Sequence, residues 1–376
     1  MPIPLIVICV IAFALAFLSL RNDGARMEWV KAAQARVAAL TRCPPATVIV
    51  PVKGGDEFLA ANLASLAAQD YPNYELIVAA RSAADIPDGV APPRARVVHS
   101  GDGDANTGEK INNLLAAVAA ARPESMIFAF ADSDNEVSPR WLRALAVPLM
   151  HPANGCSTGY RWHLPEPPDF WSSLRSVWNS VIAGEFHGRA CSFCWGGAMA
   201  VRRETFFKAR VPEFWRNAIS DDFQMSAAMH AARLPIVYAP GALVVDRSHT
   251  GGGEFLRWIE RQMIITRVYH PRIWRFSLAA HVVYCTAMVS LAVWQPWLLA
   301  ALLALGMFKS WRRARIAEAA LESKGAWFRR HGWIYAAMMP LATWVWMYSF
   351  LASARTSVIS WRGHRYRLSK DSVQRR

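Results

Sequence analysis

The first twenty residues carry no charged side chain, and this feature limits the possible folds more than any other. About 20 apolar residues in a helix cross a hydrocarbon core of about 30 Å. Basic residues follow the segment and favour the cytosolic side of a membrane; they are Arg21, Arg26, Lys31 and Arg36. A cleaved signal peptide would need a basic start, which the segment lacks. We predict a transmembrane anchor at residues 1–20 and a linker at 21–45 that begins in the cytosol.

A second apolar zone covers residues 276–308 and is interrupted at residues 294–297 (Trp-Gln-Pro-Trp). Proline removes a backbone donor and tryptophan favours the membrane–water interface, so we expect two spans joined by a short outer turn. Residues 309–330 mix basic and apolar side chains at roughly helical spacing. This spacing fits an amphipathic helix on an anionic leaflet, and it equally fits an ordinary solvated helix.

Residues 332–354 are long enough to cross a membrane, yet basic residues lie on both sides of them. Both ends therefore favour the cytosol. We predict a re-entrant hairpin that turns near residues 338–340, because broken backbone at membrane depth is tolerated where protein buries it. A further simple span is the alternative. The membrane region would then cover residues 271–355, and residues 356–376 would form a basic cytosolic tail.

The formal net charge of +14 is concentrated near the C-terminal membrane region. Residues 298–376 hold 14 Lys and Arg against three acids, which leaves +3 for the other residues. Because the excess flanks apolar segments, we expect a multi-pass membrane protein with no nucleic-acid partner, in the inner membrane if the source is bacterial. The six cysteines suggest no disulfide framework, and Cys191 and Cys194 are expected to be small buried residues.

Between residues 46 and 270, short β-rich runs alternate with amphipathic stretches. This order predicts an α/β domain with a mostly parallel sheet and helices on both faces. Such sheets bind ligands beyond the carboxyl ends of their strands. Strands are expected at 47–52, 74–80, 95–99 and 125–131, and helices at 58–68, 110–121 and 139–150.

Two acidic pairs are the strongest candidates for chemistry. Asp132 and Asp134 follow an apolar strand. Because Mg²⁺ is held by one or two carboxylates plus substrate phosphates, they could tie a metal to a diphosphate, or they could merely cap a helix. Asp221 and Asp222 follow Ser220 and begin an apolar-patterned segment, where an N-cap and first-turn acids are also ordinary.

A basic helix is expected at residues 254–269, after three glycines. Facing a cleft, its arginines would neutralise a leaving diphosphate; facing lipid headgroups, they would anchor the helix at the interface. Its candidate residues are Arg257, Trp258, Arg261 and Gln262. The motifs of dinucleotide, NTPase and metalloprotease sites are absent from the sequence.

Together these features resemble the ceramide glucosyltransferase family, whose members are inverting GT-A glycosyltransferases. The likeness covers nearly the whole chain. The strings at 110–114 (KINNL) and 359–368 are more specific to the family than the D-x-D pattern of Asp132 and Asp134. The matching strings are Val48–Gly54, Asp70–Glu75, Lys110–Leu114, Asp132-Ser133, Asp222-Phe223, Ile359–Arg362 and Arg365–Leu368.

The resemblance implies a Rossmann-like GT-A domain at residues 46–270, in the cytosol, that transfers a sugar from a nucleotide-sugar to a lipid hydroxyl. Glucose, UDP-glucose and ceramide are the expected sugar, donor and acceptor. Asp132, with Asp134, would hold Mg²⁺ or Mn²⁺, and Asp222 would match the catalytic base, with Asp221 as the second candidate. The arginine helix would contact diphosphate or acceptor. The remaining donor-binding candidates are Pro51, Lys53, Asp85, Lys110, Asn113 and Ser133.

Two departures from the family pattern leave alternatives open. The acid expected after the second strand is replaced by residues 81–85 (Arg-Ser-Ala-Ala-Asp), so Asp85 is a candidate for the uracil contact. The Q/R-x-x-R-W signature reads Trp-Ile-Glu-Arg-Gln at 258–262, with a literal Arg-Trp one turn earlier. The alternative functions are transfer to a hopanoid or a polyprenyl phosphate, or membrane-anchored sugar-nucleotide binding without catalysis. A processive polysaccharide synthase would need a pore that these few segments hardly supply.

Overall fold

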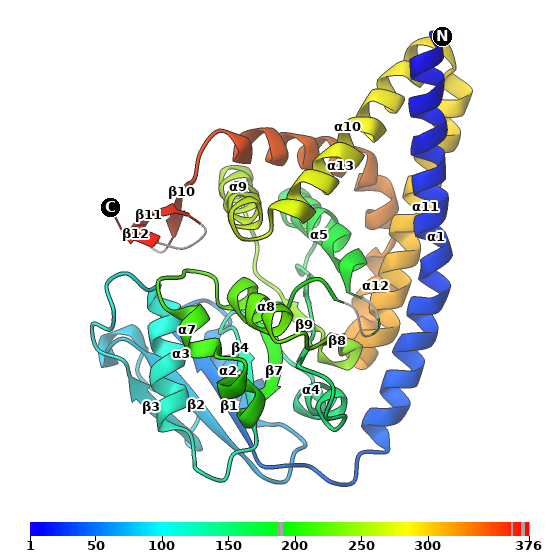
Figure 1. The fold of residues 1–376 in the computed structure, drawn as a ribbon. Helices are drawn as coiled ribbons and strands as arrows, with labels where there is room; N and C mark the ends of the chain where they lie inside the picture. The colour runs from blue at the N-terminus through cyan, green and yellow to red at the C-terminus, as the bar shows by residue number, and fades with distance from the viewer. Residues whose placement is uncertain (187, 189–190, 362–363, 370–372, 376) are drawn as a thin grey trace. The chain divides into compact units, whose positions relative to one another are not determined.

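The structure is a computed structural model that describes residues 1–186, 188, 191–361, 364–369 and 373–375. The chain forms two compact units, each assembled from segments that are distant in sequence (Figure 1). Unit 1 comprises Met1–Glu28, Leu164–Ala183 and His249–Leu368. Unit 2 comprises Trp29–His163, Gly184–Ser248 and Ser369–Arg376.

Unit 2 is built on a seven-stranded sheet in the order β3-β2-β1-β4-β7-β5-β8. β1 to β4 run parallel, whereas β7 is antiparallel to its neighbours β4 and β5. A second, two-stranded sheet pairs β6 with β9 in parallel. The strands are β1 (Ala46–Pro51), β2 (Tyr74–Ala80), β3 (Ala95–His99), β4 (Ile127–Ala131), β5 (Cys156–Thr158), β6 (Arg161–His163), β7 (Ala198–Arg202), β8 (Ile236–Tyr238) and β9 (Val244–Asp246).

The helices of unit 2 lie between these strands, as the alternating pattern predicts. The expected mixed α/β architecture is confirmed, and each strand and helix that we predicted in this part of the chain ends within two residues of its predicted position. The helices are α2 (Leu59–Ala67), α3 (Glu109–Ala120), α4 (Trp141–Leu149), α6 (Arg203–Lys208), α7 (Val211–Trp215) and α8 (Asp221–Ala231), with short 3-10 turns at Ala83–Asp85 and Pro240–Ala242.

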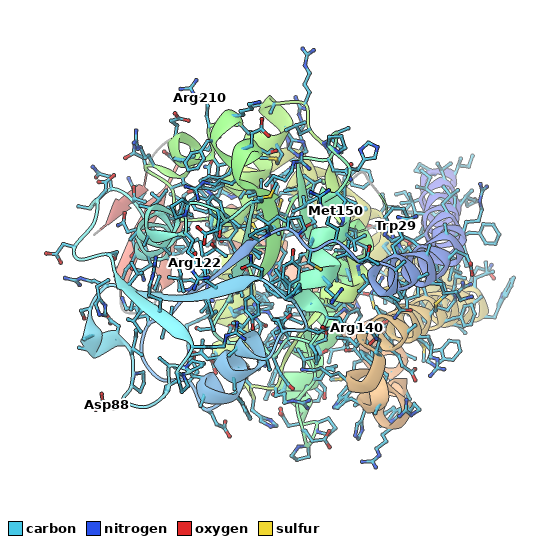
Figure 2. The ribbon with its side chains drawn as sticks, turned by 90° about the horizontal axis from the view of Figure 1, so that it is seen from below. Trp29, Asp88, Arg122, Arg140, Met150 and Arg210 are labelled. Carbon is cyan, nitrogen blue, oxygen red and sulfur yellow. The ribbon has the colours of Figure 1, made fainter. Side chains whose placement is uncertain are left out.

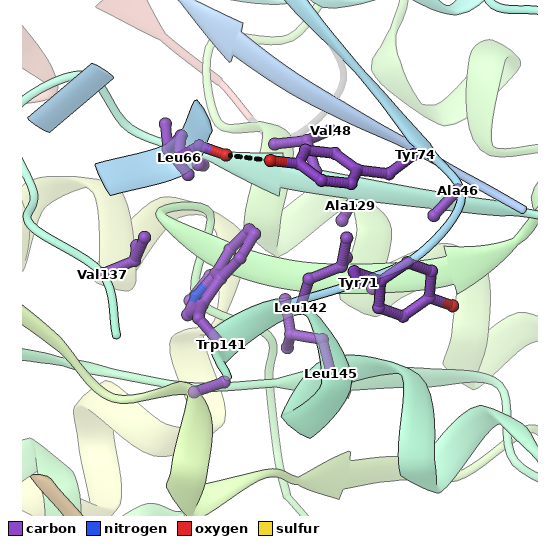
Figure 3. Packing of buried hydrophobic residues seen from close by; sticks show 14 of the residues in the cluster. Ala46, Val48, Leu66, Tyr71, Tyr74, Ala129, Val137, Trp141, Leu142 and Leu145 are labelled. Carbon is purple, nitrogen blue, oxygen red and sulfur yellow. Dashed lines mark hydrogen bonds between the residues drawn. The ribbon is translucent and has the colours of Figure 1, made fainter. Parts of the chain in front are cut away.

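The core of unit 2 packs both faces of the central strands. β1, β2 and β4 are buried almost throughout, which is typical of parallel strands covered by helices on both sides. On one face, Val48 and Ala129 pack with Trp141 and Leu142 of α4, and the Tyr74 hydroxyl donates to the Leu66 carbonyl at 3.2 Å (Figure 3). The apolar β-branched strands therefore form the rigid base of unit 2.

The C-terminal part of the first helix, from Trp29 onward, belongs to unit 2. α1 (Ile3–Ala38) is continuous, so the residues expected to form a linker at 21–45 are helical as far as Ala38. Alanine, arginine, lysine and glutamine, which favour helix, dominate residues 31–38. Trp29 donates from its indole nitrogen to the Tyr238 carbonyl at 3.1 Å and lines a pocket of about 410 Å³ that also involves Met150 (Figure 2).

Unit 1 is helical apart from a β-hairpin at its end. Its three segments contribute the start of α1, α5, and then the helices from α9 onward. β10 and β11 pair in antiparallel fashion. The elements are α5 (Phe170–Ile182), α9 (Gly252–Tyr269), α10 (Pro271–Trp294), α11 (Pro296–Leu321), α12 (Ala326–His331), α13 (Trp333–Ala354), β10 (Val358–Trp361) and β11 (His364–Leu368); the chain continues with β12 (Val373–Arg375) in unit 2.

Three helices in the described part of the chain are long and apolar enough to cross a membrane, namely α1, α10 and α13. The predicted break after Trp294 is confirmed, because α10 ends there and α11 begins at Pro296. Cys9 and Ala12 of α1 pack against Ala287 and Leu291 of α10. α11 runs on to Leu321, so the expected amphipathic stretch is largely the continuation of the preceding helix.

The predicted re-entrant hairpin at residues 332–354 is wrong. α13 is one continuous helix that passes through Pro340. Proline removes one hydrogen bond within the helix, but a helix that is packed and shielded elsewhere tolerates that loss. The carbonyl that loses its helical donor is that of Ala336, four residues before Pro340. Pro340 and the flanking basic residues were therefore too weak a signal to predict a turn.

Candidate active site

The site lies in unit 2, where the carboxyl ends of parallel strands meet. Asp132 follows β4 directly, and β1 and β2 end at the same edge of the sheet because they run parallel to β4. β7 begins at this edge, since Ala198 is paired with Ala131 in the antiparallel register. Residues 195–197, which precede β7, therefore lie beside the acid that follows β4.

Lys110 brings two of the predicted acids together. Its ammonium nitrogen lies 2.7 Å from Oδ1 of Asp132 and 2.9 Å from Oδ1 of Asp221. The three side chains come from the start of α3, the end of β4 and the start of α8. The Asp221 side chain is only 5% exposed, and that of Lys110 17%. Residues that the sequence presents as separate candidates thus form one ion-paired cluster.

Two loops tie the starts of α3 and α8 to each other. The Gly108 amide donates to the Ala218 carbonyl at 2.8 Å, and the Asn217 amide donates to the Thr107 hydroxyl at 3.0 Å. A Cβ on Gly108 would lie 3.1 Å from the Ile219 Cα, so the backbones approach closely here. These contacts fix Lys110 relative to Asp221.

Gly196 makes the close packing of the cluster possible. A Cβ at this position would lie 2.6 Å from Oδ2 of Asp221 and 3.2 Å from the Lys110 nitrogen. The first distance is shorter than real Cβ contacts, so any side chain would displace the acid. The Gly196 amide also donates to Oδ2 of Asp222 at 3.3 Å. Sequence reasoning missed this residue, since a lone Gly-Gly is an ordinary loop signal.

Asp222 has a different environment from Asp221. Its Oδ1 accepts hydrogen bonds from the Phe223 amide at 2.8 Å and from the Ser220 hydroxyl. The Ser220 hydroxyl oxygen in turn accepts from the Phe223 amide at 3.3 Å. The expected capping role is therefore confirmed for Ser220 and shared by Asp222. Asp222 is half-buried, whereas Asp221 is buried and ion-paired.

A second cation holds Asp134. The Arg161 guanidinium lies 2.9 Å from Oδ2 of Asp134 and 3.7 Å from Oδ2 of Asp246, and it stacks 5.4 Å from the Trp195 ring centre. His163 Nδ1 is 2.9 Å from the same Asp246 oxygen. We did not predict Arg161 or Asp246. Asp246 carries the signal that identified Asp132, because it too ends a buried apolar strand.

Burial and the neighbouring charges shift the pKa values of the cluster. Burial alone would lower the pKa of Lys110, but Asp132 and Asp221 outweigh burial and raise it. Burial would also lower the pKa of Arg161, but Asp134 and Asp246 outweigh burial and raise it. Burial raises the pKa of Asp221 to about 6, against the opposing effect of Lys110. Both cations therefore stay charged at neutral pH, and burial makes Asp221 a weaker acid than an ordinary aspartate.

The donor set is compatible with a divalent metal bound together with substrate. Within the described residues, no group of three or more His, Cys, Asp or Glu side chains is arranged to hold an ion alone. Two cations face five carboxylates, those of Asp132, Asp134, Asp221, Asp222 and Asp246. The formal excess of three negative charges suits a cation, and Mg²⁺ needs only one or two protein carboxylates when phosphates complete its shell.

The other donor-binding candidates lie in loops around the same edge or in the helix beside it. Lys53 is ion-paired with Glu109 at 2.7 Å, just past the end of β1 at Pro51. Asp85 caps its own turn, and its carbonyl accepts from the Gly54 amide at 2.8 Å, so it lies against the loop after β1.

Asn113 is buried and accepts from the Ser100 hydroxyl at 2.6 Å. Ser133 is buried, and its carbonyl accepts from Asn62 at 3.0 Å. Their roles toward a donor remain predictions.

The four candidates on α9 belong to unit 1. Trp258 packs edge-on against Trp178 of α5, with ring centres 5.4 Å apart, so it has a structural contact of its own. Arg257, Arg261 and Gln262 lie on the same helix, and their contact with diphosphate or acceptor remains a prediction. Arg362 of the C-terminal string lies outside the described residues. Cys191 and Cys194 are buried, as expected.

These observations define a class of protein, an α/β protein with a cation-bridged acidic site at the carboxyl edge of its sheet and with candidate membrane helices. The model of glycosyl transferase family 21 matches residues 4–373. The chain therefore belongs to glycosyl transferase family 21, and it is a glycosyltransferase. The family and the mixed sheet agree with the GT-A fold expected from the sequence.

Solved structures show more distant likeness. The mannosyltransferase PcManGT from Pyrobaculum calidifontis, in complex with GDP-Man and Mn²⁺, is 19% identical, covers 93% of this chain and 97% of its own, and has a TM-score of 0.47. A mycobacterial protein is 17% identical over 63% of this chain and 77% of its own, with a TM-score of 0.40. GalNAc-T7 with UDP, GalNAc and Mn²⁺ is 10% identical over 58% and 48%, with a TM-score of 0.41. No curated protein sequence matches the chain significantly.

Proposed function

We propose that this glycosyltransferase moves a sugar from a nucleotide-sugar to the hydroxyl of a membrane lipid by a single inverting displacement. Glucose from UDP-glucose and a ceramide-like lipid are the preferred donor and acceptor. The observation that carries the proposal is the Lys110 bridge between Asp132 and Asp221 at the carboxyl edge of the sheet. Helices able to cross a membrane support a lipid acceptor.

In this proposal, one pair of acids binds the metal and the donor, and another acid acts on the acceptor hydroxyl. Asp132, with Asp134, would hold Mg²⁺ or Mn²⁺, which when bound offsets the charge of the leaving diphosphate. Lys110 holds Asp132 in place and adds a positive charge close to it. A fixed cation near the developing charge stabilises a leaving group without reorganisation.

Asp222 is the proposed base. An inverting transfer needs one group to take the proton of the acceptor hydroxyl during in-line attack. Asp222 is the more exposed acid of the pair, and the Gly196 amide and the Ser220 hydroxyl orient its carboxylate. Asp221 is buried against Lys110, which suits a positioning role better than proton transfer.

The test is a transfer assay with full-length protein in nanodiscs. UDP-glucose and a divalent metal are supplied with ceramide, a hopanoid alcohol or a polyprenyl phosphate, and lipid products are identified by mass spectrometry. We expect a glucosylated ceramide whose anomeric configuration, measured by NMR, is opposite to that of the donor. A product on another lipid would correct the acceptor, whereas donor binding without turnover would favour the non-catalytic alternative.

A further inference from the structure

The exposed face of α13 is a single apolar stripe. We call it the α13 stripe, and its residues recur at helical spacing along the whole helix. A helix of 22 residues is about 33 Å long at 1.5 Å per residue. A solvated helix normally turns a polar face outward, so this stripe needs an apolar environment. The residues of the α13 stripe are Trp333, Ala337, Leu341, Trp344, Tyr348 and Leu351.

The opposite face of α13 carries both polar and apolar side chains, and it is fixed to the protein along its length. Tyr335, Thr343, Ser349 and Ser353 are buried on that face. Hydrogen bonds join it to α5 and α10 near both ends and in between. They link the Tyr335 and Ser176 hydroxyls (2.6 Å), the Trp346 indole and the Trp178 carbonyl (3.1 Å), and the Trp274 indole and the Ser353 hydroxyl (3.1 Å).

α13 runs across α10 and does not follow it. The second half of α13 contacts the first half of α10, where His281 stacks on Trp346 at 5.4 Å and Trp274 packs against Phe350 at 5.9 Å. The second half of α10 packs instead against the start of α1. Figure 1 shows α13 lying across the direction of α11. A helix crossing the bilayer beside α10 would follow α10 along its length.

Charged groups accompany α13 along its course. The Tyr348 hydroxyl donates to the Glu260 carboxylate of α9, and Arg267 of the same helix donates to the Thr356 carbonyl at 2.8 Å, just past the end of α13. In a crossing helix, Tyr348 would lie roughly 7 Å from the helix midpoint and would hold Glu260 inside the hydrocarbon. An ionised side chain at that depth is strongly disfavoured. At the interface the same contact carries no such penalty.

Basic residues flank α13 on both sides. Arg329 and Arg330 precede it, and Arg355, Arg365 and Arg367 follow it. Because basic residues favour the cytosolic side, both ends should lie there. A continuous helix excludes the hairpin that would otherwise return the chain. A continuous helix can have both ends on the cytosolic side when it lies flat at the membrane surface.

We propose that α13 lies in the plane of the cytosolic leaflet with the α13 stripe embedded in lipid, and that α1 and the α10–α11 hairpin make the crossings. The α13 stripe is thus a membrane-docking surface. The inference rests on contacts within unit 1 and is independent of the sugar chemistry.

Depth measurements test the orientation. Trp333→Cys, Trp344→Cys and Leu351→Cys are made in a Cys43→Ser background, because the other five native thiols are buried. Full-length protein is labelled with a fluorophore and reconstituted in phosphatidylcholine–phosphatidylglycerol vesicles that contain lipids with quenchers near the headgroup or the chain end. We expect all three sites to be quenched more by the shallow quencher, and Val289→Cys of α10 by the deep one. A deep Trp344 site between shallower end sites would overturn the proposal.

Thiol labelling in intact cells tests the leaflet. An impermeant maleimide should label Gln295→Cys, in the outer turn, and should label Arg330→Cys and Ala354→Cys, at the two ends of α13, only after permeabilisation. Labelling of one end of α13 from outside would show that α13 crosses. Labelling of both ends, with Gln295→Cys protected, would place the helix in the opposite leaflet and also overturn the proposal.

Discussion

Asp221 and Asp222 are adjacent in the sequence, yet the structure gives them separate environments. Asp221 is buried against Lys110, and Asp222 faces the Gly196 amide and the helix cap. From the sequence we predicted that one acid of the pair is the catalytic base and that the other helps to position it. It could not predict the partner of Asp221, because Lys110 is more than a hundred residues earlier and only the tied loops bring the two together.

Asp222→Asn should keep the shape of the site and remove its base. We expect turnover to fall by roughly 10² to 10⁴, the usual contribution of general-base help, while donor affinity stays near normal. Lipid glycosylation and nucleotide-sugar binding are measured side by side, with Asp221→Asn as the matched variant. Near-normal turnover in Asp222→Asn beside an inactive Asp221→Asn would transfer the role to Asp221.

Asp132→Asn should weaken donor binding chiefly in the presence of metal. A neutral amide is a poorer ligand for a hard divalent cation than a carboxylate, and the change also removes one partner of Lys110. Calorimetry of UDP-glucose binding with and without Mn²⁺ measures the effect. Asp134→Asn is the comparison and should lose less if only Asp132 contacts the metal. Full metal-dependent binding by Asp132→Asn would show that Asp132 is not a ligand.

Gly196→Ala should lower activity by at least about tenfold. The new methyl group would lie 2.6 Å from Oδ2 of Asp221 and must push the acid away from Lys110, and sub-ångström displacements of catalytic groups are costly. Gly251→Ala is the control, because a Cβ there meets nothing within 4 Å. Transfer rates of the two variants are compared at equal expression. Equal rates would mean that the cluster relaxes without loss.

At the scale of elements, the predicted helices and strands agree with the structure where the sequence shows a clear period and long buried runs. β1 to β4 and the helices between them were predictable because long apolar runs alternate with amphipathic ones. β5, β6, β8 and β9 are three residues each, too short to show a period. α13 defeated the prediction for another reason, since Pro340 and the flanking charges suggested a turn that packing against α5 and α9 does not require.

The start of α8 offers a test of how an element supports chemistry. Ser220→Ala removes the hydroxyl that accepts from the Phe223 amide and donates to Asp222. Loss of such a cap costs about 1 kcal/mol, so we expect a melting temperature lower by a few degrees together with reduced turnover. Thermal unfolding in detergent and the transfer assay measure both. Ser220→Thr should restore both properties, and a stable but slow Ser220→Ala protein would separate orientation of Asp222 from helix capping.

At the scale of the whole molecule, apolar segments predicted a membrane protein, and the basic residues beside them predicted that the site lies in the cytosol. The tail should lie on that cytosolic side, because its basic residues follow the same rule as those after residue 20. Ser369→Cys in intact cells should resist an impermeant thiol reagent and react after permeabilisation, with Gln295→Cys as the externally labelled reference. External labelling of Ser369→Cys would overturn this topology.

The division of unit 1 among three distant segments affects how the chain is made. α5 leaves the ribosome early, but its partners Tyr335 and Trp346 are synthesised more than 150 residues later. At about 5 to 20 residues per second, that helix waits roughly 8 to 30 s with Trp178 uncovered. A fragment that ends at residue 248 lacks Tyr335 and Trp346, so Trp178 would stay uncovered. Shortened versions of this protein should therefore aggregate through α5 even though the sheet of unit 2 is entirely present.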